Sequence, residues 1–231
     1  MIPKLMQSFA LPVEKVQASR RQFMLGALAV GGGVAVGFQT LSALPATAAE
    51  TTTDADGALA FTPYLTIDGQ GKVTVLSSQF EMGQGSYNGL ATLVAEELDA
   101  DWASIEVLGA AGNVKAYGNL AFGGAMQGTG GSTSMMTSWE RYRKAGAAVR
   151  AMLVTAAASE WKVQPSEIKV ADGILSHPSG QKAGFGEFAA KAATMPVPTE
   201  VKLKEPGEWK LIGNGKLKRF DSARKTNGTE H

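Results

Sequence analysis

Two glycine-rich segments carry the residues whose types and spacing could do chemistry. The first is Glu81-Met82-Gly83-Gln84-Gly85-Ser86, and the second is Gly128-Thr129-Gly130-Gly131-Ser132-Thr133-Ser134. In both, glycines stand beside amide or hydroxyl side chains, directly before a stretch with helical spacing. Glycine lets a ligand approach the backbone closely, and the first N–H groups of a helix lack intrahelical partners and attract anions. Such residues could bind a phosphate-bearing or heteroatom-rich ligand.

Each segment on its own is ambiguous. A single Gly-Gln-Gly is commonly a turn, and a single Gly-Gly-Ser-Thr-Ser is commonly a capped loop. Neither segment contains the Gly-Lys-Ser/Thr of a P-loop, and neither completes the Gly-x-Gly-x-x-Gly spacing of a dinucleotide site. If both helix starts face one space, however, they form a single cradle. The predicted site depends on that convergence.

Composition excludes several other kinds of site. The 231-residue chain has no Cys, and its two histidines, His177 and His231, are far apart in the sequence. Disulfides, thiolate zinc sites, iron–sulfur ligation, a cysteine nucleophile and a histidine metal cluster are therefore excluded within this chain. The net charge of +1 carries no basic excess of the kind that marks a nucleic-acid binder.

Hydrophobic periodicity predicts the elements around the first segment. Residues 61–68 and 72–78 alternate apolar and polar side chains on either side of Gly69-Gln70-Gly71, which predicts a β-hairpin. Apolar residues at helical spacing predict a helix over 88–98, and a strand is expected within 101–109.

The second segment leads into a long helix, the clearest element of the sequence. Its apolar stripe steps by three or four residues through Met135, Trp139, Tyr142, Gly146, Val149, Leu153 and Ala156. Ser132, Thr133 and Ser134 stand at its start as N-cap candidates. Residues 167–177 then predict a second hairpin, and 186–193 a short helix. Strands and helices alternate, so the predicted fold class is α/β (α+β), a mixed sheet with helices packed on it.

Several side chains are expected to have structural rather than chemical roles. Glu81 is interpreted as a solvated or backbone-bonded carboxylate and not as a general base. A solvated helix face is expected for Glu96 and Glu97, the core for Trp139 and Tyr142, and the surface for His177, which precedes Pro178 in a turn.

The first 49 residues are typical of an export signal. Arg20-Arg21 precedes an uncharged run of about 16 residues from Phe23 to Phe38, too short to span a membrane, and Ala46-Thr47-Ala48 resembles a signal-peptidase site. The alternative is a chance arginine pair before a buried helix. We predict a twin-arginine signal peptide over 1–49 with export to the periplasm, then a linker over 50–60, an α/β domain over 61–198, and over 199–231 an extended linker with the start of a following domain.

The ordered combination of motifs resembles the molybdenum hydroxylase family. Four stretches carry the resemblance, namely Phe80–Gly85, Ala95–Leu98, Gly131–Ser134 and Ala145–Arg150. The chain looks most like the molybdopterin-binding large subunits of the isoquinoline 1-oxidoreductase and membrane-associated aldehyde dehydrogenase type, which are relatives of xanthine dehydrogenase. The resemblance covers about residues 60–231, and it implies a fold like that of the molybdopterin-binding domain.

The resemblance implies roles for both glycine segments. In the family, the glutamine of Gly-Gln-Gly hydrogen-bonds the molybdenum cofactor, a role that falls on Gln84 with Gly83 and Gly85 beside it. The loop before the long helix contacts the pterin and its phosphate, which implies this role for Gly131, Ser132, Thr133 and Ser134. The implied cofactor is molybdenum with molybdopterin cytosine dinucleotide, in which the pterin dithiolene, not the protein, holds the metal.

The resemblance also implies an activity and partners. The reaction would be hydroxylation of an aldehyde or an N-heterocycle with oxygen from water, with electrons passed to an iron–sulfur small subunit and on to a haem-carrying cytochrome c subunit. Membrane association would come through these partners. The family's catalytic glutamate has no counterpart in this sequence, and Trp209–Gly213 and Arg219–Lys225 resemble the start of the next domain.

We therefore expect the first quarter to third of a longer subunit, either truncated or split, that is inactive alone and is completed by the remaining domains or by a complementary chain. The residues leave one alternative open. The chain could instead be an exported, non-enzymatic α/β module whose glycine segments bind an anionic ligand.

Overall fold

A computed structural model describes residues 59–215 and 217–229, with side chains from Thr62 onward. The predicted signal peptide over 1–49 and most of the predicted linker over 50–60 lie outside the described residues. In the described part of the chain, no helix has both the length and the apolar character needed to cross a membrane.

A four-stranded sheet leads the chain into the first glycine segment. Its strands β1 (Leu59–Thr62), β2 (Leu65–Ile67), β3 (Val73–Ser77) and β4 (Ile105–Gly109) lie in that order. β2 and β3 form the predicted antiparallel hairpin, and the Asp68 carboxylate accepts N–H groups of its turn. β4 pairs parallel to β3, so helix α2 (Ser86–Leu98) between them completes a β-α-β unit.

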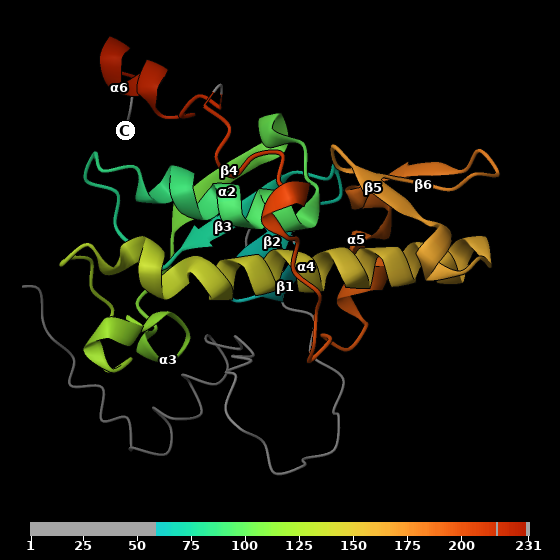
Figure 1. The fold of residues 1–231 in the computed structure, drawn as a ribbon, viewed down its shortest axis with the longest axis horizontal. Helices are drawn as coiled ribbons and strands as arrows, with labels where there is room; N and C mark the ends of the chain where they lie inside the picture. Colours follow the sequence, from blue (N-terminus) through green and yellow to red (C-terminus); the bar gives the residue numbers. More distant parts are fainter. Residues whose placement is uncertain (1–58, 216, 230–231) are drawn as a thin grey trace, which may run out of the picture. The chain divides into compact units, whose positions relative to one another are not determined.

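Two helices pack together against this sheet. Helix α4 (Thr133–Trp161) is 29 residues long and runs beside α2 in front of the sheet (Figure 1). α2 contacts β3 and β4, and α4 contacts β1. The predicted stripe of α4 is buried from Tyr142 to Ala156. At the crossing, a Cβ on Gly146 would lie 2.6 Å from the carbonyl oxygen of Val94, so only glycine allows this approach.

The first turns of α4 differ from the sequence prediction. Tyr142 is fully buried as expected, and its hydroxyl donates to the carbonyl of Leu76 and accepts the N–H of Ser78 at the end of β3. Trp139, also expected in the core, is 36% exposed. That expectation was wrong because Trp139 faces a distant part of the chain, where Trp209 packs edge-on at 5.8 Å between ring centres.

A second, smaller sheet follows α4. Strands β5 (Lys169–Ala171), β6 (Ile174–Ser176) and β7 (Lys182–Gly184) are antiparallel in that order, and helix α5 (Phe185–Ala193) continues from β7 to contact α4, β1 and β2. His177, in the turn after β6, is more buried than predicted. Only 11% of its side chain is exposed, and Ser179 hydrogen-bonds its ring.

The C-terminal segment, residues 201–229, packs along α2, and this overturns the expectation that Glu96 and Glu97 face solvent. Both carboxylates are buried. Glu96 accepts three backbone N–H bonds from residues 210–212 and pairs with Lys204, and Glu97 pairs with Arg143. Buried carboxylates need such partners. Short helix α6 (Ser222–Asn227) then reaches the opposite end of α2 (Figure 1).

Candidate functional site

The two residues that lead into the first glycine segment, Gln79 and Phe80, are hydrogen-bonded to the second segment. The side-chain oxygen of Gln79, which is buried, accepts hydrogen bonds from the hydroxyls of Thr129 at 3.1 Å and Ser134 at 3.2 Å. The N–H of Phe80 donates to the same Thr129 hydroxyl at 2.8 Å. Residues about fifty positions apart therefore form one hydrogen-bonded unit, which joins the second segment to the two residues that lead into the first.

In the first segment, the chain's own carboxylate occupies the start of α2. Glu81 accepts N–H bonds from Gly83 at 2.7 Å, from Gly85 at 3.0 Å and from Tyr87 at 3.1 Å. Gly83 and Gly85 have φ values of 103° and 89°, a left-handed backbone that glycine adopts readily and that turns these N–H groups inward. The interpretation of Glu81 as a backbone-bonded carboxylate is confirmed.

The electrostatics around Glu81 keep it ionised. Burial acts to raise its pKa, but the N–H bonds from Gly85, Tyr87 and Gly83 and the charge of Lys225 together lower it below its usual range. A carboxylate that is fully charged at neutral pH therefore sits at the positive end of the α2 dipole. At this helix start, an anionic ligand would meet a position that is already filled.

Gln84 is exposed, but its amide turns back into its own segment. The side-chain oxygen accepts the N–H of Met82 at 2.6 Å, and the side-chain nitrogen donates to the carbonyl of Phe80 at 2.6 Å and to the Ser86 hydroxyl at 3.2 Å. These bonds shape the turn around Gly83. Both N–H groups of the side-chain nitrogen are used by these bonds, so the capacity left to the amide is one further bond to its oxygen.

The start of α4 differs, because no side chain of the described residues caps it, although the N–H of Thr133 donates to the carbonyl of Gly130 at 3.2 Å. Ser132 occupies the N-cap position, as its type suggested, but its φ of 57° is left-handed and its hydroxyl makes no capping bond. A serine caps a helix from extended backbone, so the left-handed backbone accounts for the missing cap. Ser132 and Gly131 are both exposed.

The hydroxyls of Thr133 and Ser134, which follow Ser132, are used inside the protein. Thr133 donates to the carbonyl of Gly130 at 2.7 Å, and Ser134 donates to Gln79. Sequence reasoning missed a third anchor, Asn119, which is fully buried. Its amide nitrogen donates to the carbonyl of Gly128 and to the Thr133 hydroxyl, each at 2.9 Å. An asparagine within a glycine-dense stretch was the available signal.

A charged cluster from the C-terminal segment, also missed, borders the first segment. Arg219 donates to the carbonyl of Gly83 at 3.0 Å and makes a two-point ion pair with Asp221, which also pairs with Lys225. The hydrogen bond from Arg219, with smaller help from Lys225, holds the pKa of Asp221 far below its usual range against the opposing effect of burial. No local pattern in the sequence links residues 83 and 219.

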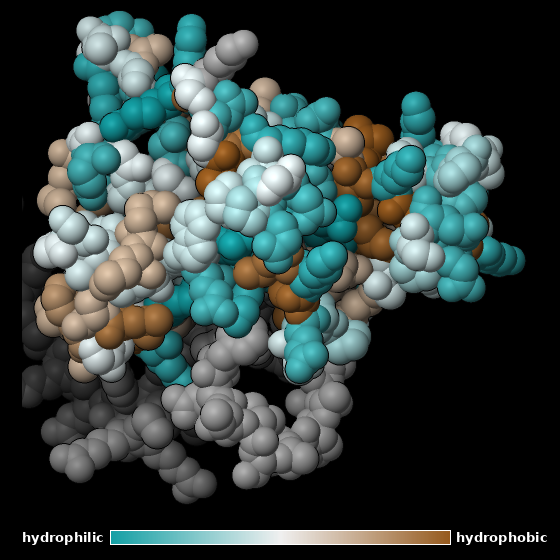
Figure 2. All heavy atoms as spheres, viewed as in Figure 1, coloured by the Kyte–Doolittle hydropathy of each residue, from teal (hydrophilic) through white to brown (hydrophobic). Residues whose placement is uncertain are grey.

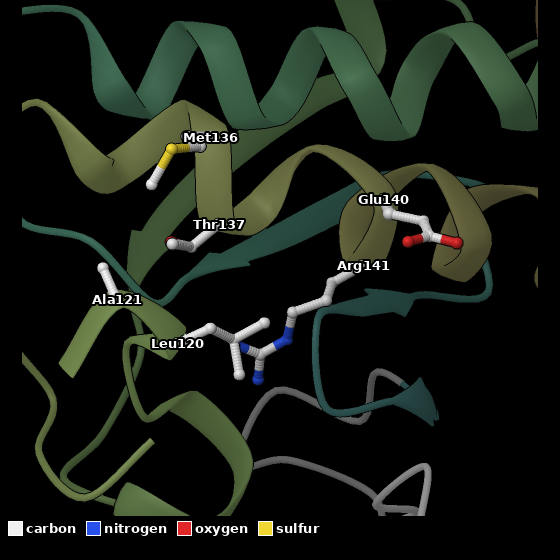
Figure 3. Close-up of a pocket in the computed structure, with 6 residues that line it drawn as sticks. All are labelled: Leu120, Ala121, Met136, Thr137, Glu140 and Arg141. Atoms are coloured by element: carbon white, nitrogen blue, oxygen red, sulfur yellow. The ribbon is translucent and has the colours of Figure 1, made fainter. Parts of the chain in front are cut away.

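A surface pocket of about 340 Å³ opens beside the first turns of α4. In Figure 3, Leu120 and Ala121 face Met136 and Thr137 across it, and the guanidinium of Arg141 points to its floor beside Leu120. Each of the three nitrogens of that guanidinium already donates within the protein, to Tyr64 and to the carbonyls of Gly118 and Ala116. None of the predicted site residues lines this pocket.

Comparison with known proteins assigns a family model and relatives to the chain. The model for the molybdopterin cofactor-binding domain matches residues 7–229. The membrane-bound aldehyde dehydrogenase (pyrroloquinoline-quinone) of Gluconacetobacter polyoxogenes is 34% identical over 222 residues, which are 94% of this chain and 27% of that protein. Isoquinoline 1-oxidoreductase subunit beta of Brevundimonas diminuta is 34% identical over 181 residues, which are 77% of this chain and 22% of that protein.

Solved structures give more distant matches. Quinoline 2-oxidoreductase from Pseudomonas putida 86 aligns with a TM-score of 0.42 and 22% identity, over 60% of this chain and 17% of that one. Reconstituted CO dehydrogenase from Oligotropha carboxidovorans aligns with a TM-score of 0.42 and 20% identity, over 54% and 15%. The chain spans about a quarter of the length of its two curated relatives.

Proposed function

The chain belongs to the molybdopterin cofactor-binding domain family, and from this premise we propose that it forms the cofactor-holding part of a molybdenum hydroxylase large subunit. The complete enzyme would hydroxylate an aldehyde or an N-heterocycle with oxygen from water and pass the electrons to partner subunits. The names of the two curated relatives, an aldehyde dehydrogenase and an isoquinoline oxidoreductase, support these substrate classes. This chain alone is expected to have no turnover.

One structural relationship carries the proposal. Gln79, two positions before the first glycine segment, is hydrogen-bonded to the second, which supports a site in which a single bulky ligand contacts both. A phosphorylated pterin has this bulk, with a phosphate for a helix start and ring heteroatoms for amide and hydroxyl groups.

The residues present fit such a ligand at the start of α4. No side chain caps this helix end within the described residues, and an added Cβ at Gly130 would meet nothing within 4 Å, so a ligand can reach the backbone there. The described residues also contain no group of three His, Cys, Asp or Glu side chains that could hold a metal ion. A metal carried by the pterin itself needs no such group.

The seven predicted site residues would have two kinds of role, direct contact with the ligand and support of the loop. Ser132 and the backbone of Gly131 would contact the phosphate and pterin directly, and Gln84 would do so from the first segment, where Gly83 and Gly85 let the ligand approach. Thr133 and Ser134 would act by holding the loop, because their hydroxyls already bond within the protein. When bound, the cofactor supplies the oxidation chemistry, and these residues bind and orient it.

Finer features of the proposal rest on the family resemblance and on the N-terminal sequence. The cofactor would be the cytosine dinucleotide form of molybdopterin. An iron–sulfur small subunit, and a cytochrome c subunit beyond it, would accept the electrons. The arginine pair at 20–21 and the run that follows support export by the twin-arginine route to the periplasm, where partners would attach the enzyme to the membrane.

An apolar surface around the two segments supports the proposal that the remaining large-subunit domains cover this face. Six large apolar side chains, each between 39% and 71% exposed, flank the segments: Phe80, Met82, Leu120, Phe122, Met126 and Met136. Figure 2 shows tan and brown spheres on the left of the view, where the start of α4 and the loop before it lie. Large exposed apolar patches mark interaction sites. The relatives' additional length supplies an occupant.

The proposal is tested by cofactor content in the enzyme assembled with its natural partner chains. Gln84→Ala and Ser132→Ala should each lower the molybdenum and pterin retained per protein after gel filtration, because each removes a hydrogen bond worth about 1–3 kcal/mol. Molybdenum is measured by mass spectrometry and pterin by the fluorescence of its oxidised form. Gln70→Ala and Ser159→Ala are matched controls at exposed positions outside the segments.

Three other results would each contradict a part of the proposal. Full cofactor content in both site variants would remove Gln84 and Ser132 from the site. Recovery of pyrroloquinoline quinone in place of pterin would show that the proposed cofactor is wrong. That measurement is included because the name of one relative contains pyrroloquinoline quinone. A metal-free monomer that binds a simple anion would favour the alternative function, a non-enzymatic binding module with the open α4 start as its site.

A further inference from the structure

The guanidinium of Arg219 is held in one orientation before it reaches the first glycine segment. Asp221 accepts two parallel hydrogen bonds from it, at 2.9 Å from Nε and 2.5 Å from Nη2. Asp221 is itself buried, and Lys225 donates at 2.6 Å to the same oxygen, Oδ2, that accepts from Nη2. A two-point pair of this kind fixes the plane of the guanidinium. The direction in which the third nitrogen, Nη1, points is therefore fixed by the bonds between the guanidinium and Asp221.

That third nitrogen contacts the segment that carries Gln84. Nη1 of Arg219 donates to the carbonyl of Gly83 at 3.0 Å, and Nη2 lies 3.5 Å from the carboxylate of Glu81. An added Cβ on Gly85 would lie 3.1 Å from Nη1, so the arginine also packs closely over the next glycine. Arg219 thus contacts Gly83 and Gly85 on either side of Gln84. It also contacts the carboxylate of Glu81, which accepts the N–H groups of the segment.

Within the described residues, no other hydrogen bond is made to the carbonyl of Gly83. The other hydrogen bonds within the segment are local, and Lys225 adds a longer ion pair to Glu81 at 3.8 Å. Glu81 bonds to Gly83, Gly85 and Tyr87, and Gln84 bonds to residues two or four positions away. Local bonds shape the turn but do not fix its position on the protein. Arg219 supplies an attachment from 136 residues downstream.

We propose that Arg219 is a positioning residue for the proposed cofactor site, which it serves by anchoring the Gly83–Gly85 turn to the C-terminal segment. This inference rests on the proposed function for its ligand, but the anchoring itself is a property of the chain alone. It also gives the C-terminal segment a role. Glu96 fastens this segment to the far end of α2 through residues 210–212, and Arg219 carries the attachment back to the end where the turn lies.

Hydrogen exchange of the 231-residue chain, followed by NMR, tests the anchoring without any cofactor. In Arg219→Gln, the amides of Gly83, Gly85 and Tyr87 should exchange about tenfold faster, because the turn opens locally more often. Lys218→Gln is the matched control: it removes the same charge one position earlier, from an exposed side chain, and should leave these amides unchanged. Arg219→Lys keeps the charge but has one nitrogen, so intermediate exchange is expected.

The exchange of α4 amides in the same spectra separates local loosening from general destabilisation. If Arg219→Gln does not fold, Arg219→Lys carries the test against Lys218→Gln. Equal exchange of the three turn amides in the arginine variant and in the Lys218 control would overturn the proposal.

A second arm uses the enzyme assembled with its natural partners. Arg219→Gln should retain several-fold less molybdenum and pterin than Lys218→Gln. A loosened turn with full cofactor content would also overturn the positioning role. Failure of the proposed function is recognised separately, because Gln84→Ala and Ser132→Ala would then retain all their cofactor, whatever the exchange data say about Arg219.

Discussion

The buried side-chain oxygen of Gln79 lies 3.2 Å from the hydroxyl of Ser134, and this contact ties the end of strand β3 to the first turn of helix α4. The same oxygen accepts the Thr129 hydroxyl, whose own oxygen accepts the N–H of Phe80. Two glycine segments that could have been independent turns are therefore parts of one unit. A change at Gln79 should consequently reach both of them.

Replacement of Gln79 by Met is expected to destabilise the chain by about 1–3 kcal/mol. Met has a similar shape but accepts hydrogen bonds only weakly, so the hydroxyls of Thr129 and Ser134 lose a buried partner. Urea unfolding of the 231-residue chain measures the change. In the assembled enzyme, the same variant should lower molybdenum content, although Gln79 does not itself face the ligand.

The matched control is Gln70→Met, in the exposed turn of the β2–β3 hairpin. Its stability should stay within about 0.5 kcal/mol of the parent chain. If Gln79→Met were as stable as this control, the hydrogen bonds to Gln79 would contribute nothing to the free energy of unfolding.

Local signals in the sequence were enough to predict much of the fold. The β2–β3 hairpin, helices α2 and α4, and the β5–β6 hairpin each come from patterns within about thirty residues, and each is present. The parallel pairing of β3 with β4 was not predicted, because hydrophobic alternation does not say which strands become neighbours. Burial of Glu96 was missed for the same reason, since its partners lie more than a hundred residues downstream.

The candidate site, like the fold, was predicted from the sequence only in part. Glycine content and helix starts located both segments, and the residues that lead into the first are bonded to the second. Their opposite character was not predicted, because it depends on single side chains. Glu81 fills the start of α2, whereas the left-handed backbone of Ser132 leaves the start of α4 open. Arg219 and Asn119 reach the segments through tertiary contacts that no local pattern specifies.

Replacement of Glu96 by Gln should release the C-terminal segment from α2. One oxygen of Glu96 accepts the N–H groups of residues 210–212, and the other pairs with Lys204. A neutral amide cannot replace both oxygens as acceptors, and it would remove one of the two carboxylate partners of Lys204, which keeps its ion pair with Asp99 at 2.8 Å. Loss of about 1–3 kcal/mol is expected. Trypsin should then cut more rapidly after Lys204 and Lys210, which mass spectrometry of the fragments would identify.

Glu140→Gln is the control for this experiment. Glu140 is exposed and pairs with Lys144 at 2.6 Å on one turn of α4. Such pairs contribute less than about 0.5 kcal/mol, so stability and cleavage should both stay near those of the parent chain. Equal protease resistance in the Glu96 and Glu140 variants would show that the segment is held by other contacts.

Replacement of Gly146 by Ala should destabilise the crossing of α2 and α4. The new Cβ would lie 2.6 Å from the carbonyl oxygen of Val94, a backbone atom that cannot move without shifting α2. Helix propensity alone would favour Ala by about 0.5–1 kcal/mol, but the overpacking costs about 1–3 kcal/mol and should prevail. Thermal unfolding compared with Gly69→Ala, where an added Cβ meets nothing within 4 Å, tests this. An increase in melting temperature in Gly146→Ala would rule out the close crossing.

The contribution of the buried carboxylates to stability should be independent of pH above about pH 5 and should fall at lower pH. Burial acts to raise the pKa of Glu96, but N–H bonds from Leu211 and Ile212 and the Lys204 ammonium lower it, and the pKa of Asp221 is lowered chiefly by Arg219. Because these carboxyls have lower pKa values folded than unfolded, the unfolded chain binds more protons in acid. Their stabilisation is complete above the ordinary range of carboxyl pKa values and is lost as the pH falls toward the depressed values.

Each such group adds a slope of up to about 1.4 kcal/mol per pH unit to the dependence of the free energy of unfolding on pH. Glu96→Gln should therefore lose stability less steeply in acid, in urea unfolding measured between pH 7 and pH 3. Parallel acid limbs in the variant and the parent chain would mean that Glu96 titrates alike in both states, against the buried anchoring role assigned to it.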